Sequence, residues 1–128
     1  MIHFASASLP AKPVRVRRCL QEAAIIVRSR GLAQFDREQR GSKRVCIHGA
    51  IGIAACGTPH ATDSNPLYAR SVRVVCHVLR ERDSGVTGVA PNAAARWNNV
   101  PGRTTEEVAQ LLELAARRVK VNSHARKD

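Results

Sequence analysis

Apolar side chains recur at spacings of three and four residues in three long stretches of the chain, and this pattern predicts three amphipathic helices. The first begins at Pro13 and ends before Gly31, because proline suits a first helical turn and glycine suits the left-handed position just past a helix end. The second begins after the capping residue Asn65, with Pro66 in its first turn, and ends at residues 83–85. The apolar stripes consist of Val16, Cys19, Leu20, Ala23, Ala24 and Val27 in the first, of Leu67, Ser71, Val74, Val75, Val78 and Leu79 in the second, and of Val108, Leu111, Leu112, Ala115 and Val119 in the third.

The third helix carries the clearest start signal in the chain. Thr104 and Glu107 have the spacing of a capping box, in which the threonine hydroxyl and the glutamate carboxylate each accept a hydrogen bond from the other residue's backbone amide. Glu106 favours the positive end of the helix dipole, and Arg117 and Arg118 favour the negative end. We therefore expect a helix from Thr104 to the polar residues 122–128.

Residues 44–56 are the most apolar part of the chain, and they are apolar on every side, which predicts a buried, central element. Ser42 is a candidate N-cap for a helix here. A strand is the alternative, because Val45, Ile47, Ile51 and Ile53 are β-branched. Gly49 and Gly52 weaken either element unless a neighbour packs closely against them. The alanine-rich end and the length favour the helix.

Two shorter segments complete the pattern. The polar run 31–41, with Phe35 as its one aromatic side chain, is either a loop or a short helix. A short helix is expected from Pro91 to Trp97, and Trp97 is expected to be the one large anchor of the core. Together these elements predict an all-α fold: a single-domain bundle of four to five helices over residues 13–121, with a flexible arm at 1–12 and a frayed tail at 122–128.

Charge is the strongest compositional signal, because the 128 residues carry a formal net charge of +11. Residues 1–60 hold ten basic and three acidic side chains, so the excess leans toward the N-terminal half. Such a charge favours nucleic acid or an acidic protein as a partner, although a merely solvated basic surface is an equal alternative. The candidate phosphate-binding residues are Arg15, Arg17, Arg18, Arg28, Arg30, Arg40, Lys43, Arg44, Arg70 and Arg73.

The type of nucleic acid follows from two further features. Aromatic side chains are scarce, which argues against base stacking and therefore against recognition of single strands. The helix expected over 66–82, with Arg70, Arg73 and Arg80 on its open side, suits a DNA groove better than the apolar segment 44–56 does.

Cysteine and histidine raise the question of a metal site or a catalytic thiol. Cys46 and His48 would point about 200° apart on a helix, and Cys56 and His60 are separated by the helix breakers Gly57 and Pro59. We therefore expect no metal ligands, and we expect buried thiols with surface imidazoles. No local pattern activates a thiol as a nucleophile, so no catalytic residue is predicted.

Cofactors and membranes are not indicated either. The Gly49-Ala-Ile-Gly52 segment lacks the lysine of a phosphate-binding loop and suggests close helix packing instead. No apolar run is long enough to cross a membrane, and the first ten residues are too polar for a signal peptide. We expect a cytoplasmic protein with reduced cysteines.

Two segments together resemble a known family. They are Gly41-x-x-x-Val45-Cys46-x-x-Gly49-Ala50-Ile51 and Ala94-x-Arg96-Trp97-Asn98-Asn99-x-Pro101-Gly102-Arg103-Thr104-x-Glu106-Glu107-Val108. The pattern, over residues 14 to 120, is similar to a family of short proteins in actinobacteria and their phages that is known only as a domain of unknown function. The resemblance implies a bacterial or phage protein and supplies no activity. Asn99 stands where the family pattern has aspartate.

The second segment has a structural interpretation from its residues alone. Asn98 and Asn99 are expected to close the short helix through side-chain-to-backbone hydrogen bonds, and Pro101-Gly102 is expected to turn the chain toward Thr104. Trp97, Asn98, Pro101, Gly102, Thr104, Glu107 and Gly49 are therefore assigned to structure.

Three functional hypotheses remain open. The first is a non-enzymatic binding or regulatory protein whose basic face contacts nucleic acid. The second is an interaction module that docks on an acidic host protein. The third is an enzyme or metalloprotein that uses the cysteine and histidine set.

Overall fold

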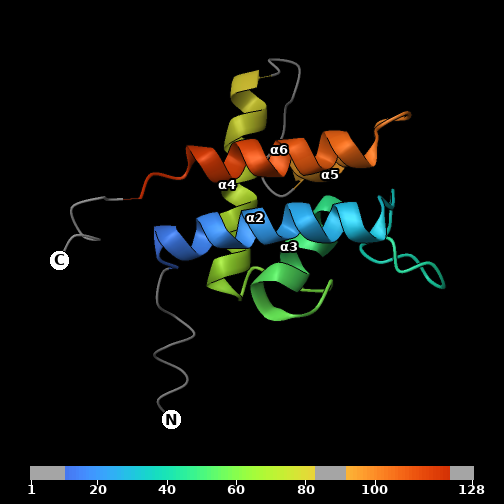
Figure 1. The fold of residues 1–128 in the computed structure, drawn as a ribbon, viewed down its shortest axis with the longest axis horizontal. Helices are drawn as coiled ribbons and strands as arrows, with labels where there is room; N and C mark the ends of the chain where they lie inside the picture. The colour runs from blue at the N-terminus through green and yellow to red at the C-terminus, as the bar shows by residue number, and fades with distance from the viewer. Residues whose placement is uncertain (1–10, 83–91, 122–128) are drawn as a thin grey trace, which may run out of the picture.

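Five helices form the described part of the chain, residues 11–82 and 92–121 of the computed structural model (Figure 1). They are α2 (Pro13–Arg30), α3 (Ile47–Cys56), α4 (Pro66–Arg82), α5 (Asn92–Asn98) and α6 (Thr105–Arg118). Over the same residues, β-structure is limited to two isolated bridges, from Val45 to Leu32 and to Glu38. The prediction of a small all-α bundle is confirmed.

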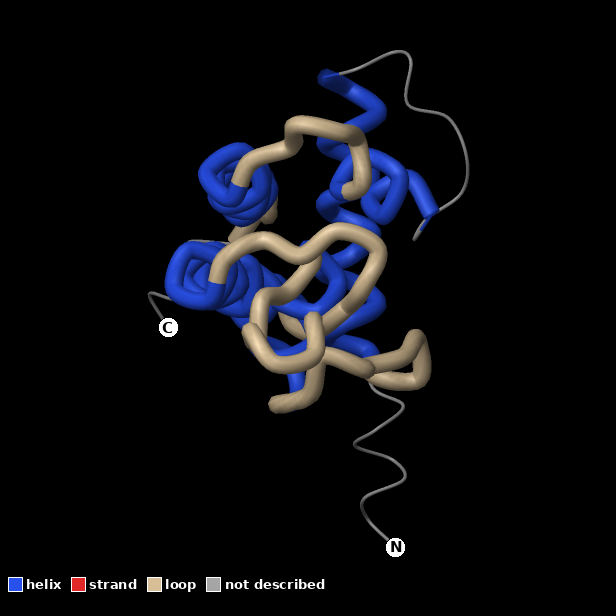
Figure 2. The backbone as a smooth tube through the Cα atoms, turned by 90° about the vertical axis from the view of Figure 1, so that its right-hand side faces the viewer, coloured by secondary structure: helices blue, strands red, loops and turns tan. Residues whose placement is uncertain are grey.

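The helices lie in two layers. Helices α2 and α6 run side by side and antiparallel, and α4 crosses behind both of them (Figure 1). Helix α3 packs against α2, α4 and α5. Figure 2 looks along α2 and α6 and shows that the loop after α2 and the loop between α5 and α6 gather at one end of the bundle.

The predicted apolar stripes form the core. Every stripe residue of α2 and α6 is buried, and in α4 only Val74 is partly exposed. Alanines on both α2 and α6 are buried, and their small side chains allow the helix axes to approach closely. At the surface, Arg28 of α2 joins two acids of α6, with its Nε 3.0 Å from Glu106 Oε1 and its Nη1 2.5 Å from Glu113 Oε2. Both ends of α6 therefore dock on α2, since Arg17 Nη2 also donates to Val119 O at 2.7 Å.

The apolar segment expected over 44–56 is a helix, and it begins three residues later than predicted. Val45 is held extended by its two bridges, so helix α3 starts at Ile47. The N-cap is Cys46, whose Sγ accepts a hydrogen bond from Gly49 N at 3.4 Å, and the predicted cap Ser42 is wrong. Ser42 instead bonds Gln39 within a tight turn. Residues 47–52 are buried, whereas the last turn of α3 is partly exposed.

Gly49 and Gly52 allow close packing, but against loops and not against another helix. A Cβ atom at Gly49 would lie 2.0 Å from the carbonyl oxygen of Arg37, and one at Gly52 would lie 2.5 Å from that of Thr58. The loop after α2 therefore rests directly on the backbone of α3. The same Arg37 oxygen accepts a hydrogen bond from Cys46 N at 3.2 Å, which fixes the loop over the start of the helix.

The large buried ring of the core is Tyr68, and the prediction that Trp97 has this role is wrong. Tyr68 is 1% exposed, whereas Trp97 is only partly buried and packs at the edge of the core. The guanidinium of Arg103 covers the outer face of the indole, 3.9 Å from its centroid, and Arg103 Nε donates to Trp97 O. The guanidinium shields the exposed face of the indole from water, so Trp97 is stable at the edge of the core.

The ends of the predicted domain are described in part. Ala11, which was assigned to the flexible arm, is 7% exposed and belongs to the core. Lys12, the last residue of the predicted arm, is the N-cap residue of α2. Residues 1–10, the tail 122–128 and the expected proline start of the short helix lie outside the described residues. Among the helices that are described, none combines the length and the apolar character that a membrane span needs.

Substituting Gly49→Ala tests the close approach of the loop to α3. The methyl group would overlap the Arg37 carbonyl, and overpacking against backbone costs roughly 3 kcal/mol of the free energy of unfolding. Gly57→Ala is the matched control, because a Cβ there meets nothing within 4 Å and the cost is limited to the left-handed backbone, roughly 1 kcal/mol. Urea denaturation of the three proteins measures both effects. Equal losses would show that the contact at Gly49 relaxes freely.

The Arg28 ion pairs predict an acid-sensitive stability. The hydrogen bonds from Arg28 lower the pKa of Glu106 and of Glu113 below their ordinary value of 4.5. Carboxylates with lowered pKa stabilise the fold above their ordinary pKa, and this contribution is lost as the pH falls through the lowered pKa. The free energy of unfolding should therefore fall as the pH drops below about 4.5, and Arg28→Gln should flatten this slope while Arg73→Gln leaves it unchanged. Urea titrations at a series of pH values measure the slope, and a slope that Arg28→Gln leaves unchanged would contradict the assignment.

Candidate functional site

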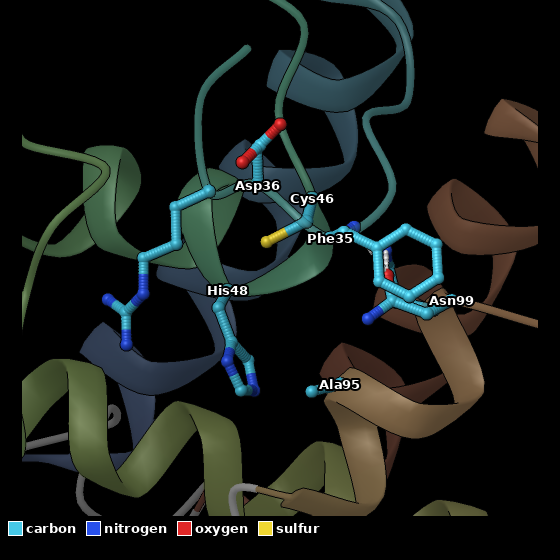
Figure 3. A pocket seen from close by; sticks show the side chains of 8 residues that line it. Phe35, Asp36, Cys46, His48, Ala95 and Asn99 are labelled. Atoms are coloured by element: carbon cyan, nitrogen blue, oxygen red, sulfur yellow. Dashed lines mark hydrogen bonds between the residues drawn. The ribbon is translucent and has the colours of Figure 1, made fainter.

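A pocket of about 180 Å³ lies where the loop after α2, the start of α3 and the end of α5 meet (Figure 3). Both of the distinctive sequence segments contribute to its walls, so residues about 50 positions apart in the chain face one space. In Figure 3, Phe35 and Asn99 lie on one side, and Cys46 and His48 lie on the other with Ala95 below. The lining consists of Phe35, Asp36, Arg37, Cys46, His48, Ala95, Asn98 and Asn99.

Asn98 holds the three walls together. Its side chain is 1% exposed, and its Oδ1 accepts a hydrogen bond from Ile47 N, the first amide of α3, at 2.9 Å. Its Nδ2 donates to Ala33 O in the loop at 3.1 Å and to Asn99 Oδ1 at 3.0 Å. The Asn98 side chain therefore makes three hydrogen bonds, and two of them join α5 to α3 and to the loop.

Further hydrogen bonds join the loop after α2 to the segment that follows α5. Asn99 Oδ1 accepts from Phe35 N at 2.8 Å, and Gln34 Nε2 donates to the carbonyl oxygens of Asn98 and Val100. Leu32 N donates to Thr105 Oγ1 at 3.0 Å. The prediction that Asn98 and Asn99 close the short helix is therefore wrong. Their side chains bond to other elements, because the loop and α3 bring unpaired backbone groups within reach.

The thiol and the imidazole of the pocket are both largely enclosed. Cys46 is half-buried, and burial raises the pKa of its thiol. His48 is 6% exposed, and its ring meets the edge of Tyr68 with centroids 6.4 Å apart. A thiol with a raised pKa is protonated at neutral pH, which is the opposite of what a nucleophilic cysteine requires.

The expected 200° separation of Cys46 and His48 does not hold. Cys46 precedes the first helical residue, so its side chain does not follow the helical register, and both residues line the same pocket. No group of three or more candidate metal ligands occurs in the part of the chain that the structure describes. The expectation of buried thiols and surface imidazoles is half right: Cys19 and Cys76 are buried, but Cys56 is exposed and His48 is buried.

Phe35 is the feature of this site that the sequence pattern did not single out. Its ring is 79% exposed, and its backbone has a φ of +72°. A bulky side chain in the left-handed region is rare and strained, and strain of this kind concentrates at functional sites. The hydrogen bond from Phe35 N to Asn99 fixes this conformation. The only sequence signal at Phe35 was that it is the one aromatic side chain in the polar run 31–41.

The basic residues predicted to form one continuous face are divided among different tasks. Arg28 and Arg30 of α2 bind Glu106, Glu113 and Glu38 within the chain, and Arg17 binds a backbone carbonyl. Arg15 and Arg18 are exposed at the start of α2, roughly 20 Å of helix from its other end. A face running from residue 15 to residue 44 is therefore interrupted by internal ion pairs.

Two groups of basic side chains are exposed on the described structure, and five of their members, Arg40, Lys43, Arg44, Arg70 and Arg73, make no ion pair there. Arg40, Lys43 and Arg44 lie on a turn closed by hydrogen bonds between the backbones of Gln39 and residues 43–44. Arg70 and Arg73 lie on α4, where the exposed residues His77 and Arg80 continue the same side of the helix. We call the first group the basic turn and Arg70, Arg73, His77 and Arg80 the α4 row.

The predicted capping chemistry is present. Thr104 Oγ1 accepts from Glu107 N at 3.1 Å, and Glu107 Oε1 accepts from Thr104 N at 2.9 Å. These bonds lower the pKa of Glu107. Gly102 turns the chain with a φ of +84° after Pro101, which is exposed. Arg103, to which the sequence assigned no role, pairs with Glu107 at 3.5 Å and covers Trp97.

A family model matches residues 11–118 of the chain and is described as a family of unknown function, DUF6197. The protein belongs to this family. No curated protein and no solved structure shows significant similarity to the chain. The matched range contains the whole pocket, the basic turn and the α4 row.

Truncating Asn98 should damage the fold more than truncating its neighbour. Asn98→Ala leaves the amide of Ile47 and the carbonyl of Ala33 buried without their partner, at a cost of roughly 2–4 kcal/mol in the free energy of unfolding. Asn99→Ala removes a partly exposed acceptor and should cost about 1 kcal/mol. Thermal and urea denaturation compare the two variants. A loss at Asn98 no larger than that at Asn99 would refute the central role of the buried amide.

Proposed function

We propose that the protein binds duplex nucleic acid, and that the α4 row makes the principal phosphate contacts. The observation that carries this proposal is the alignment of four basic side chains on the open side of one helix. At 3.6 residues per turn, positions 70, 73, 77 and 80 fall within an arc of about 80°. The row extends over roughly 15 Å along the helix axis at 1.5 Å per residue.

The dimensions and surroundings of α4 support this choice. The major groove of B-DNA, about 12 Å wide, admits a helix with exposed polar side chains. The opposite side of α4 packs in the core, so the row is displayed by a fixed element. Glu81, the acidic residue nearest the end of the row, already pairs with Arg118 and lies 3.4 Å from His77.

The aromatic side chains support a duplex rather than a single strand as the ligand of this surface. Tyr68 of α4 is buried in the core, and Trp97 is covered by Arg103. The only ring in the α4 row is the imidazole of His77, which lies beside Glu81, so the row offers no series of rings on which successive bases could stack. Its contribution is therefore electrostatic and should depend steeply on salt.

The setting of this activity is part of the proposal. The abundance of arginine and alanine suits a GC-rich genome, and the motif pattern supports an actinobacterial or phage origin. A cytoplasmic location agrees with four cysteines that are unpaired in the structure.

The double variant Arg70→Gln/Arg73→Gln tests the α4 row. Its affinity for a duplex should fall, and the slope of log K against log salt should become shallower by roughly 2, because two phosphate contacts are lost. Arg15→Gln/Arg18→Gln removes the same charge from exposed sites on α2 and should have a smaller effect. Fluorescence anisotropy over a series of salt concentrations measures both quantities.

Two results would reject the proposal. Equal effects of the two double variants would show that the α4 row contributes only to the net charge and makes no specific phosphate contacts. Absence of duplex binding at low salt, together with a stoichiometric partner that survives nuclease treatment of a host lysate, would favour the acidic-protein alternative.

A further inference from the structure

We propose that the pocket beside Phe35 binds one unpaired nucleobase, with the ring stacked on Phe35 and the attached phosphate held by the basic turn. The site is separate from the α4 row and does not depend on it. The shared ligand chemistry is a nucleotide whose base is free to leave a stack. Its source is either a free nucleotide or an unpaired base within a nucleic acid.

The first argument is the exposure of Phe35. An aromatic ring that is 79% exposed contributes little to the core, yet the chain holds it through a strained backbone at φ +72°. Asn99 and Gln34 tie this part of the loop to the bundle. The ring is thus displayed in a fixed position, which lowers the entropic cost of stacking a ligand on it.

The second argument is the size of the pocket. Pockets for drug-sized ligands occupy roughly 300–1,000 Å³, so a pocket of about 180 Å³ suits one ring system rather than a whole cofactor. Its lining combines the apolar surfaces of Phe35 and Ala95 with polar groups at the edge. Flat, polar-edged and ring-sized groups match this description.

The third argument is the chemistry of the edge groups. The Nδ2 of Asn99 has no hydrogen-bond partner in the described structure and can donate to a ring nitrogen or a carbonyl oxygen. Asp36 carries an exposed carboxylate that can accept from an exocyclic amine. Donors and acceptors at the edge of a stacked ring are the elements by which proteins recognise unpaired bases.

The fourth argument is the charge near the pocket. Asp36 would repel a phosphate, but the basic turn, with Arg40, Lys43 and Arg44 exposed, begins four residues further along the same loop. A nucleotide whose base enters the pocket can direct its phosphate toward this turn. A ligand without negative charge, such as a cationic side chain, would gain from Asp36 but would be opposed by the net charge of +11.

The scarcity of aromatic residues is consistent with this proposal. Successive bases of a long single strand need several stacking platforms, whereas one extruded base needs one. The exposed phenyl ring of Phe35 beside a ring-sized pocket suits recognition of one base.

The experiment compares a fully paired duplex with the same duplex carrying one bulged purine, by fluorescence anisotropy with the full-length protein. The wild type should bind the bulged duplex roughly 5- to 150-fold more tightly, which is the usual effect of one stacked base. Phe35→Leu keeps an apolar side chain without an aromatic face and should remove this preference. Phe35→Tyr should retain it, and Ile25→Ala, at another exposed apolar residue (65% exposed), is the matched control.

A second measurement identifies the source of the base and does not require duplex binding. Titration with purine mononucleotides should shift the amide resonances of Phe35, His48 and Asn99 in the wild type and not in Phe35→Leu. Such shifts without a preference for the bulge would assign the pocket to free nucleotides. If the protein shows neither shifts nor a preference, the inference is wrong, whatever the α4 row does. If duplex binding fails but the shifts occur, the α4 proposal falls and this one stands.

Discussion

The buried amide of Asn98 is the interaction on which the pocket end of this molecule depends. It satisfies the first amide of α3 and a carbonyl of the loop after α2, and it belongs to α5. Without it, three segments that are far apart in the chain would meet around unpaired backbone groups, which a protein interior tolerates poorly. The close approach of the Arg37 carbonyl to Gly49 completes the junction by removing the space that a side chain would need. A pocket with fixed walls follows from these two constraints.

The arginines of the surface fall into two groups, those that pair within the fold and those that are exposed to solvent. Some of the arginines close the bundle: Arg28 joins α2 to two acids of α6, and Arg103 covers the indole of Trp97. Others, Arg70 and Arg73 on α4 and the three cations of the basic turn, are exposed and make no ion pair within the described structure. Net charge by itself does not distinguish these two groups, because both contribute equally to the total. The distinction depends on which acids the fold brings near each arginine.

Local patterns predicted the elements that local forces determine. The stripes of α2 and α6 and the Thr104–Glu107 capping box depend on residues within a few turns of one another, and they appear as expected. The start of α3 was misplaced because Val45 is held by bridges to Leu32 and Glu38, which no local pattern reveals. Asn98 was assigned to its own helix for the same reason, because its partners Ile47 and Ala33 are distant in the chain. Phe35 was noted as the one aromatic of its run but was given no functional role, because a single aromatic in a polar run has no periodicity to interpret.

The hydrogen bond between Phe35 and Asn99 has a consequence for how the site comes into being. Its two residues are 64 positions apart, and the other bonds of the junction span similar distances. Helices α2, α4 and α6 can each begin to form from local contacts, whereas closing loops of this length comes at an entropic cost that only the assembled bundle repays. No short fragment of the chain contains the pocket. The site is therefore a property of the completed tertiary structure. It exists only when the first and last thirds of the described chain are packed together.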